Sequence, residues 1–140
     1  MTVLEWTLRK GTHTLGRYAP LLCAMQISLF IVGTIFWVDA MMGARNFDPN
    51  TWGQFAYAFP AAMWAGWNMA ASAITFVGLI DPIKRQMVIV GGTLHSLQFA
   101  LLAYSITMTG GEIPVGLYSG AFFLPLHMWI TWRAVTDDTR

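Results

Sequence analysis

The chain has 140 residues, of which 56% are hydrophobic and 11% are charged, and its net charge is +1. Soluble domains carry about 25% charged residues, so this composition argues against a water-covered surface and favours contact with lipid. The near-neutral charge argues against nucleic acid as a partner, because phosphate binding requires a basic patch. The single cysteine, Cys23, excludes a disulfide within the chain.

Four stretches that are free of charged residues define the predicted membrane spans. A helix rises about 1.5 Å per residue, so roughly 20 residues cross a hydrocarbon core about 30 Å thick. Backbone groups in lipid need internal hydrogen bonds, which makes the helix the expected conformation. The sequence predicts an all-α, polytopic integral membrane protein, with a four-helix transmembrane bundle as the single membrane domain over residues 1–140. The predicted spans are residues 18–40, 55–80, 86–109 and 113–132.

The N-terminal arm precedes the first span. Thr2 and Glu5 have the spacing of a helix capping box, which predicts a short helix on the membrane surface over residues 3–10. The uncharged run of the first span is longer than the apolar region of about 7–15 residues in a cleaved signal peptide. The first span is therefore interpreted as a membrane anchor.

The second uncharged stretch contains more residues than one crossing needs. We expect residues 49–58 to extend the helix or to lie along the membrane surface, and Pro60 to mark a bend or the start of the helix. After this span, Asp81-Pro82 places a capping acid directly before a proline, which favours the start of the next helix there.

The basic residues predict the orientation of the chain in the membrane. Seven of the eight fall on one side of the predicted bundle: Arg9, Lys10, Arg17, Lys84, Arg85, Arg133 and Arg140. Only Arg45 falls on the other side. Under the positive-inside rule this asymmetry places both termini in the cytoplasm, and the expected location is a bacterial inner membrane.

Small residues recur every four positions on three of the predicted helices. The sets are Ala58, Ala62, Gly66 and Ala70; Gly92, Ser96 and Ala100; and Gly116 and Gly120. This spacing lets helix backbones approach closely in a membrane. The sets have two interpretations, packing within this chain or a surface for self-association or for a partner protein.

Polar residues inside the spans are the candidate functional residues. Counted from the nearest cytoplasmic charge, one from each helix falls roughly 9 to 15 Å below the cytoplasmic surface. These four residues, the polar layer, are Gln26, Ser72, His95 and His127. Asn68 and Gln98 extend the layer toward the middle of the membrane.

The polar layer has three interpretations. It can hold the helices together through hydrogen bonds, with neutral histidines. Alternatively, His95 and His127 can be the axial ligands of one b-type haem, although their predicted depths differ by about 6 Å. The third interpretation is a proton path or a ligand pocket. The sequence has no catalytic or metal-binding motif, so catalysis has no positive support.

These features predict a small membrane protein that acts through helix association, and they favour a role other than catalysis without deciding it. It is expected to be an accessory subunit of a membrane complex or a self-assembling, holin-like pore former, with itself or another membrane protein as its partner in the lipid bilayer. The alternatives are a small bis-histidine b-type cytochrome that exchanges electrons with quinone, and a small-solute transporter or channel that works as an oligomer.

Overall fold

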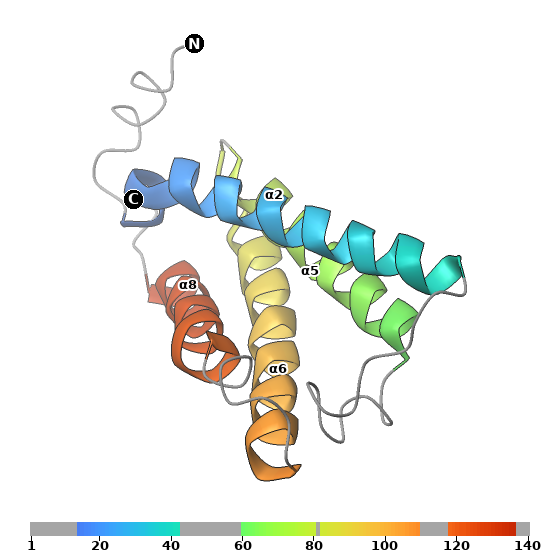
Figure 1. Ribbon diagram of the computed structural model, residues 1–140. Coiled ribbons are helices and arrows are strands. Elements are labelled where there is room, and N and C mark those ends of the chain that lie inside the picture. Colours follow the sequence, from blue (N-terminus) through green and yellow to red (C-terminus); the bar gives the residue numbers. More distant parts are fainter. Residues whose placement is uncertain (1–13, 43–59, 81, 110–117, 137–140) are drawn as a thin grey trace.

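The structure, a computed structural model, describes residues 14–42, 60–80, 82–109 and 118–136. Within these ranges the chain is helical and has no strand. The elements are α2 (Thr14–Met41), α5 (Ala61–Leu79), α6 (Arg85–Thr109), the π-helical turn η1 (Tyr118–Phe123) and α8 (Leu124–Thr136), as Figure 1 shows. The predicted surface helix at 3–10, the 49–58 segment and the first residues of the fourth span lie outside the described residues.

Two of the helices, α2 with 28 residues and α6 with 25, are long and apolar enough to cross a membrane. The 19 residues of α5 fall short of that test because Asn68 and two tryptophans lower its mean hydropathy. The 13 residues of α8 are too few to cross a membrane on their own, but α8 continues directly from η1.

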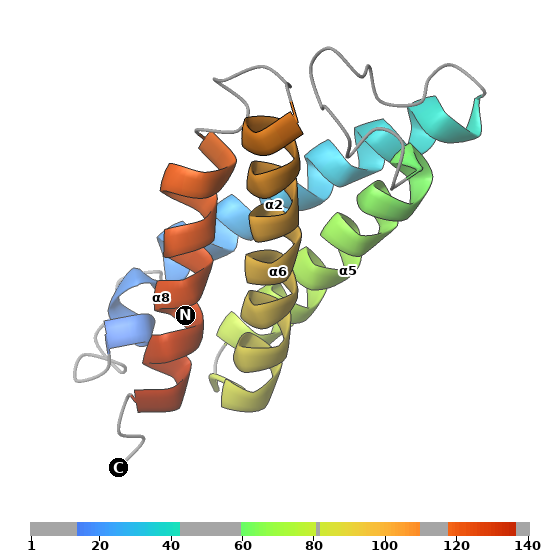
Figure 2. The same ribbon diagram turned by 90° about the horizontal axis from the view of Figure 1, so that it is seen from below.

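Consecutive helices pack as antiparallel neighbours. Helix α2 packs on α5, α5 on α6, and α6 on α8. In Figures 1 and 2, α2 and α5 run side by side in opposite directions, and so do α6 and α8. The N-terminal half of α2 also reaches α8, where the ring centroids of Tyr18 and Trp129 lie 6.0 Å apart.

The starts of two helices bear on the sequence expectations. Helix α5 begins at Ala61, directly after Pro60. Helix α6 begins at Arg85, three residues after Pro82, so the expectation that Asp81-Pro82 starts this helix was wrong. The reason is a backbone turn: the Lys84 amide donates to the carbonyl of Gly78 at 2.8 Å, which folds the chain back on the end of α5 before α6 starts.

The interior consists of two apolar clusters with the polar layer between them. The first contains Leu15, Leu22, Leu79, Val88, Ile130 and Ala134. The second contains Leu29, Ala61, Trp64, Ala65, Phe99, Leu102 and Ile106. On α2, for example, Gln26 follows Leu22 of the first cluster and precedes Leu29 of the second. The polar layer is therefore sealed by apolar side chains toward both ends of the helices.

The small residues bring helix backbones together within the chain. A Cβ atom on Gly91 would lie 2.7 Å from the backbone nitrogen of Thr75, so α5 and α6 touch there. A Cβ on Gly92 would clash with the hydroxyl of Thr131 on α8, and one on Gly120 would lie 3.2 Å from Cβ of Ala103 on α6. These contacts support the interpretation that the small residues serve packing within the chain.

Candidate functional site

The structure brings the polar layer together at the centre of the helices. Each of its members, Gln26, Ser72, His95 and His127, has a relative exposure of 0%. The ring centroids of the two histidines lie 4.4 Å apart, on facing sides of α6 and α8. A buried polar group needs hydrogen bonds, so the partners of these side chains decide what the layer can do.

The hydrogen bonds of His127 fix its tautomer. Its Nδ1 lies 2.8 Å from the carbonyl oxygen of Phe123, one helical turn back. A carbonyl accepts only, so Nδ1 carries the hydrogen and Nε2 presents a lone pair. The side-chain nitrogen of Gln26 lies 3.3 Å from Nε2 and donates to it. The amide of Gln26 is thereby oriented, with its nitrogen toward α8.

His95 is held from the opposite side. Its Nε2 lies 3.1 Å from the hydroxyl oxygen of Ser72 on α5, and its Nδ1 has no partner among the described residues. The bond between Nε2 and Ser72 forms with either tautomer: Nε2 donates to the hydroxyl oxygen when it carries the hydrogen, and it accepts from the hydroxyl when Nδ1 carries the hydrogen.

The rings of the two histidines lie closer together than the expected depth offset, with centroids 4.4 Å apart. Counting residues from the nearest charge predicts an offset of about 6 Å between them. The rings are instead in contact. Counting residues from a charge gives a distance along the helix axis. The depth that corresponds to this distance depends on the tilt of the helix, which can differ from one helix to the next.

Aromatic rings and amides complete the surroundings of the histidines. Phe99 stacks on both, with ring centroids 5.6 Å from His95 and 5.5 Å from His127. The amide nitrogen of Asn68 donates to the carbonyl of Leu29, and that of Gln98 donates to the carbonyl of Trp64. All of these bonds join different helices, so the layer ties the bundle together.

The arrangement does not fit a haem between the two histidines. An iron with two axial imidazoles needs a porphyrin ring between them. Ring centroids 4.4 Å apart are at the distance of stacked rings in contact and leave no room for one. Both Nε2 atoms also have hydrogen-bond partners already. Haem ligation stays a prediction that would require α6 and α8 to move apart.

The sequence reasoning found the four members of the layer but missed two features around it. One is Phe99, because nothing in the sequence distinguishes it from the other apolar residues of the predicted spans. The other is Arg85, whose Nε and Nη2 donate to two carbonyls in the last turn of α8, those of Ala134 and Val135, at 2.7 and 2.6 Å. The described residues contain no group of three or more His, Cys, Asp or Glu that could hold a metal ion.

Comparisons with known proteins do not add to this geometry: no known family, curated protein or solved structure matches the chain. The arrangement itself offers hydrogen bonds between neutral groups in an apolar interior. It joins the helices to one another.

Proposed function

We propose that the chain is a four-span membrane protein with both termini in the cytoplasm, which works by helix association with a second copy and not by catalysis. The lengths and apolar character of α2 and α6 support membrane insertion. Helix α5 has 19 residues, and η1 and α8 together form a continuous stretch over residues 118–136, so each approaches the length of one crossing.

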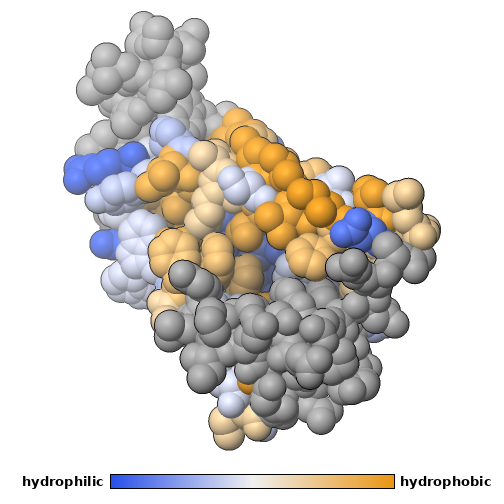
Figure 3. Space-filling model, in the orientation of Figure 1, coloured by the Kyte–Doolittle hydropathy of each residue, from blue (hydrophilic) through white to orange (hydrophobic). Residues whose placement is uncertain are grey.

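The observation that carries the proposal is the outward side of α2. Six exposed residues follow one another at intervals of three and four positions along this side: Leu21, Ala24, Ser28, Ile31, Ile35 and Val38. We call them the outer seam. The space-filling view shows hydrophobic residues gathered along α2 (Figure 3). Alternating intervals of three and four are the pattern by which two helices pack along their length.

The inner side of α2 carries a second row with the same spacing, and this row is already occupied. It consists of Leu15, Ala19, Leu22, Gln26, Leu29 and Gly33, all buried against the rest of the chain. The outer seam lies opposite, and its larger members remain open, with Ile31 52% and Ile35 56% exposed. Helix α2 is therefore suited to lie between its own bundle and another helix.

A second copy suits this seam. All copies insert with the same orientation, so two α2 helices related by a twofold axis along the membrane normal run parallel, with each seam residue near its own counterpart. The small residues Ala24 and Ser28 would then permit close approach of the two backbones. The Ser28 hydroxyl already donates to the carbonyl of Ala24 at 3.0 Å, so it brings no unpaired donor to the contact.

Disulfide cross-linking in native membranes tests the proposal. In a Cys23→Ser background, Ile31→Cys places a thiol on the outer seam, and Leu97→Cys places one on α6 at a matched exposure, 52% against 51%. We expect mild oxidation to convert the Ile31→Cys protein to a dimer, because the two thiols meet across the axis. The Leu97→Cys protein should remain monomeric.

Two other outcomes are informative. Equal cross-linking of both variants would reflect random collision and would refute the seam. If Ile31→Cys gives no dimer but the seam becomes protected from thiol reagents when one defined protein copurifies, the chain is an accessory subunit of a different complex. An Ile31→Cys thiol that neither cross-links nor gains protection would refute helix association through α2.

A further inference from the structure

The basic side chains of the described helices gather at one end of the molecule. The start of α2, the start of α6 and the end of α8 meet at this end, as Figure 2 shows. Leu15, Val88 and Ala134, one from each of these segments, belong to the same apolar cluster. The described residues place four cations there: Arg17, Lys84, Arg85 and Arg133. Their one acid, Asp39, lies near the opposite end of α2.

The sequence as a whole keeps this end positive. In the proposed orientation the seven basic residues of the cytoplasmic side are accompanied by four acids: Glu5, Asp81, Asp137 and Asp138. A positive cytoplasmic end lies beside the leaflet that carries anionic lipids. The charge therefore points to a negatively charged partner at this level of the membrane.

Two of the cations flank an aromatic contact between α2 and α8. Tyr18 follows Arg17 on α2, and its ring centroid lies 6.0 Å from that of Trp129 on α8. Arg133 comes about one helical turn after Trp129, so it lies on the same side of α8. The guanidinium carbon of Arg133 lies 4.8 Å from the ring centroid of Trp132. We call these five residues the cationic face.

We propose that the cationic face binds the negatively charged headgroup of a phospholipid, with the lipid phosphate at Arg17 and Arg133. The inference rests on the membrane insertion and orientation of the proposed function, but not on its second copy. It adds a partner of different chemistry, and it uses other residues than the outer seam.

The chemistry of the cationic face suits a lipid phosphate. A guanidinium binds phosphate oxygens through the N–H groups in its plane, whereas its flat side stacks on rings. The stacking of Arg133 on Trp132 is therefore compatible with a phosphate at the edge of the guanidinium. Tyrosine and tryptophan favour the level of the headgroups, because their rings are apolar and each carries one polar group. Tyr18 is 44% and Trp132 55% exposed, so lipid can reach both.

The other two cations of this end are placed differently. Arg85 donates from Nε and Nη2 to the carbonyls of Ala134 and Val135, so its guanidinium is engaged with α8. Lys84 precedes α6, and its backbone amide donates to the carbonyl of Gly78 near the end of α5. Lys84 thus adds charge to the same end without belonging to the cationic face. It serves as a control for the general attraction of positive charge to anionic lipid.

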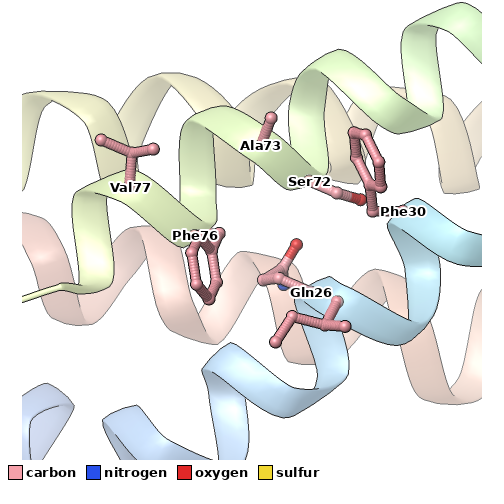
Figure 4. Close-up of a pocket in the computed structure, with 7 residues that line it drawn as sticks. Gln26, Phe30, Ser72, Ala73, Phe76 and Val77 are labelled. Atoms are coloured by element: carbon pink, nitrogen blue, oxygen red, sulfur yellow. The ribbon is translucent and has the colours of Figure 1, made fainter.

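A hollow between α2 and α5 lies on the other side of α2. Ile27, in its wall, comes about two and a half helical turns after Tyr18, which places the two residues on opposite sides of the helix. The exposed lining of the hollow is apolar. Gln26 and Ser72 lie at its inner end (Figure 4) but are fully buried. In a membrane it can contact the acyl chains of any lipid, so selection between headgroups requires the cationic face.

Electron spin resonance of spin-labelled lipids tests the proposal, with the full chain reconstituted in phosphatidylcholine vesicles. Lipids in contact with the protein give a motionally restricted signal, and its size gives the relative association constant of each labelled lipid. We expect phosphatidylglycerol to bind about fivefold more tightly than phosphatidylcholine, which is the preference that one well-placed basic residue supplies at an anionic lipid. Added salt should reduce the preference, because it screens the charges.

Three kinds of variant locate the site. Arg17→Gln and Arg133→Gln should each lower the preference for phosphatidylglycerol about twofold or more, and the double variant should abolish it. Lys84→Gln removes the same charge from the same end and should leave the preference unchanged. Ala73→Phe fills the hollow between α2 and α5 and should also leave it unchanged. An undiminished restricted signal from phosphatidylcholine shows that each variant is folded and inserted.

The outcomes separate this inference from the proposed function. No restricted signal from either lipid would mean that the chain is not inserted, which would refute both. A restricted signal with no preference for phosphatidylglycerol would overturn the lipid site alone. Equal losses in Lys84→Gln and Arg17→Gln would also overturn it, because general charge attraction would then explain the preference. Inorganic phosphate at constant ionic strength should not displace the labelled lipid; displacement would assign the face to free phosphate and overturn the lipid proposal.

Discussion

The contact between α5 and α6 at Gly91 gives the sharpest test of the packing. The methyl group of Gly91→Ala would lie 2.7 Å from the backbone nitrogen of Thr75 and 3.0 Å from the carbonyl oxygen of Ala71, where ordinary contacts begin at 3.4 Å. The side-chain hydroxyl of Thr75 lies closer still and can turn away, but these two backbone atoms cannot. Helices α5 and α6 would have to separate, and overpacking of this kind costs about 1–3 kcal/mol.

A matched control removes the effect of helix propensity. Alanine in place of glycine favours a helix by roughly 0.5–1 kcal/mol wherever it stands. In Gly66→Ala the new methyl group would lie 3.2 Å from Cζ3 of Trp37, a side chain that can shift. We therefore expect Gly91→Ala to be about 1–3 kcal/mol less stable than Gly66→Ala, because the propensity gain cancels between them.

The assay is unfolding in detergent by increasing sodium dodecyl sulfate, followed by tryptophan fluorescence. The free energies of unfolding of Gly91→Ala, Gly66→Ala and the wild type are compared under one set of conditions. Equal stability of the two variants would mean that α5 and α6 do not touch at Gly91, and the helix arrangement would be wrong.

Three further predictions follow from the same structure. Reporter fusions at Thr139 and Asn46 should report opposite sides of the membrane, because three crossings separate them in the proposed four-span topology; the same side for both would refute that topology. Arg85→Met should lower the free energy of unfolding by about 1–2 kcal/mol, because two charge-assisted hydrogen bonds to the end of α8 are lost, and Arg85→Lys should recover part of it. His127→Ala should cost about 1 kcal/mol and His127→Gln less, since glutamine keeps a donor and an acceptor; equal losses would show that hydrogen bonding is not what His127 supplies.

The helical nature of the chain could be predicted from its sequence, but the packed faces could not. In lipid the outward side of a helix is as apolar as the inward side, so the sequence carries little contrast between them. Helix α2 illustrates this: Leu22 is buried and Leu21 is 69% exposed, although the two residues are chemically the same. Only the arrangement of the neighbouring helices distinguishes them.

The polar layer could be predicted because polar side chains are few inside the spans and their positions can be counted from the charged ends. The partners could not be predicted in this way. That Gln26 pairs with His127 and Ser72 with His95 depends on which helices are neighbours. The tautomer of His127 depends on a backbone carbonyl one turn away, at the junction of η1 and α8.

The amide side chains in and beside the polar layer use only one of their two polar atoms to join helices. Gln26, Asn68 and Gln98 each donate from the amide nitrogen to another helix, and each leaves its amide oxygen without a partner among the described residues. These oxygens are not needed to hold the helices together. Apolar side chains of similar shape would fill the same space without the free-energy cost of burying an unpaired acceptor. The layer thus has more acceptors than its own donors can satisfy.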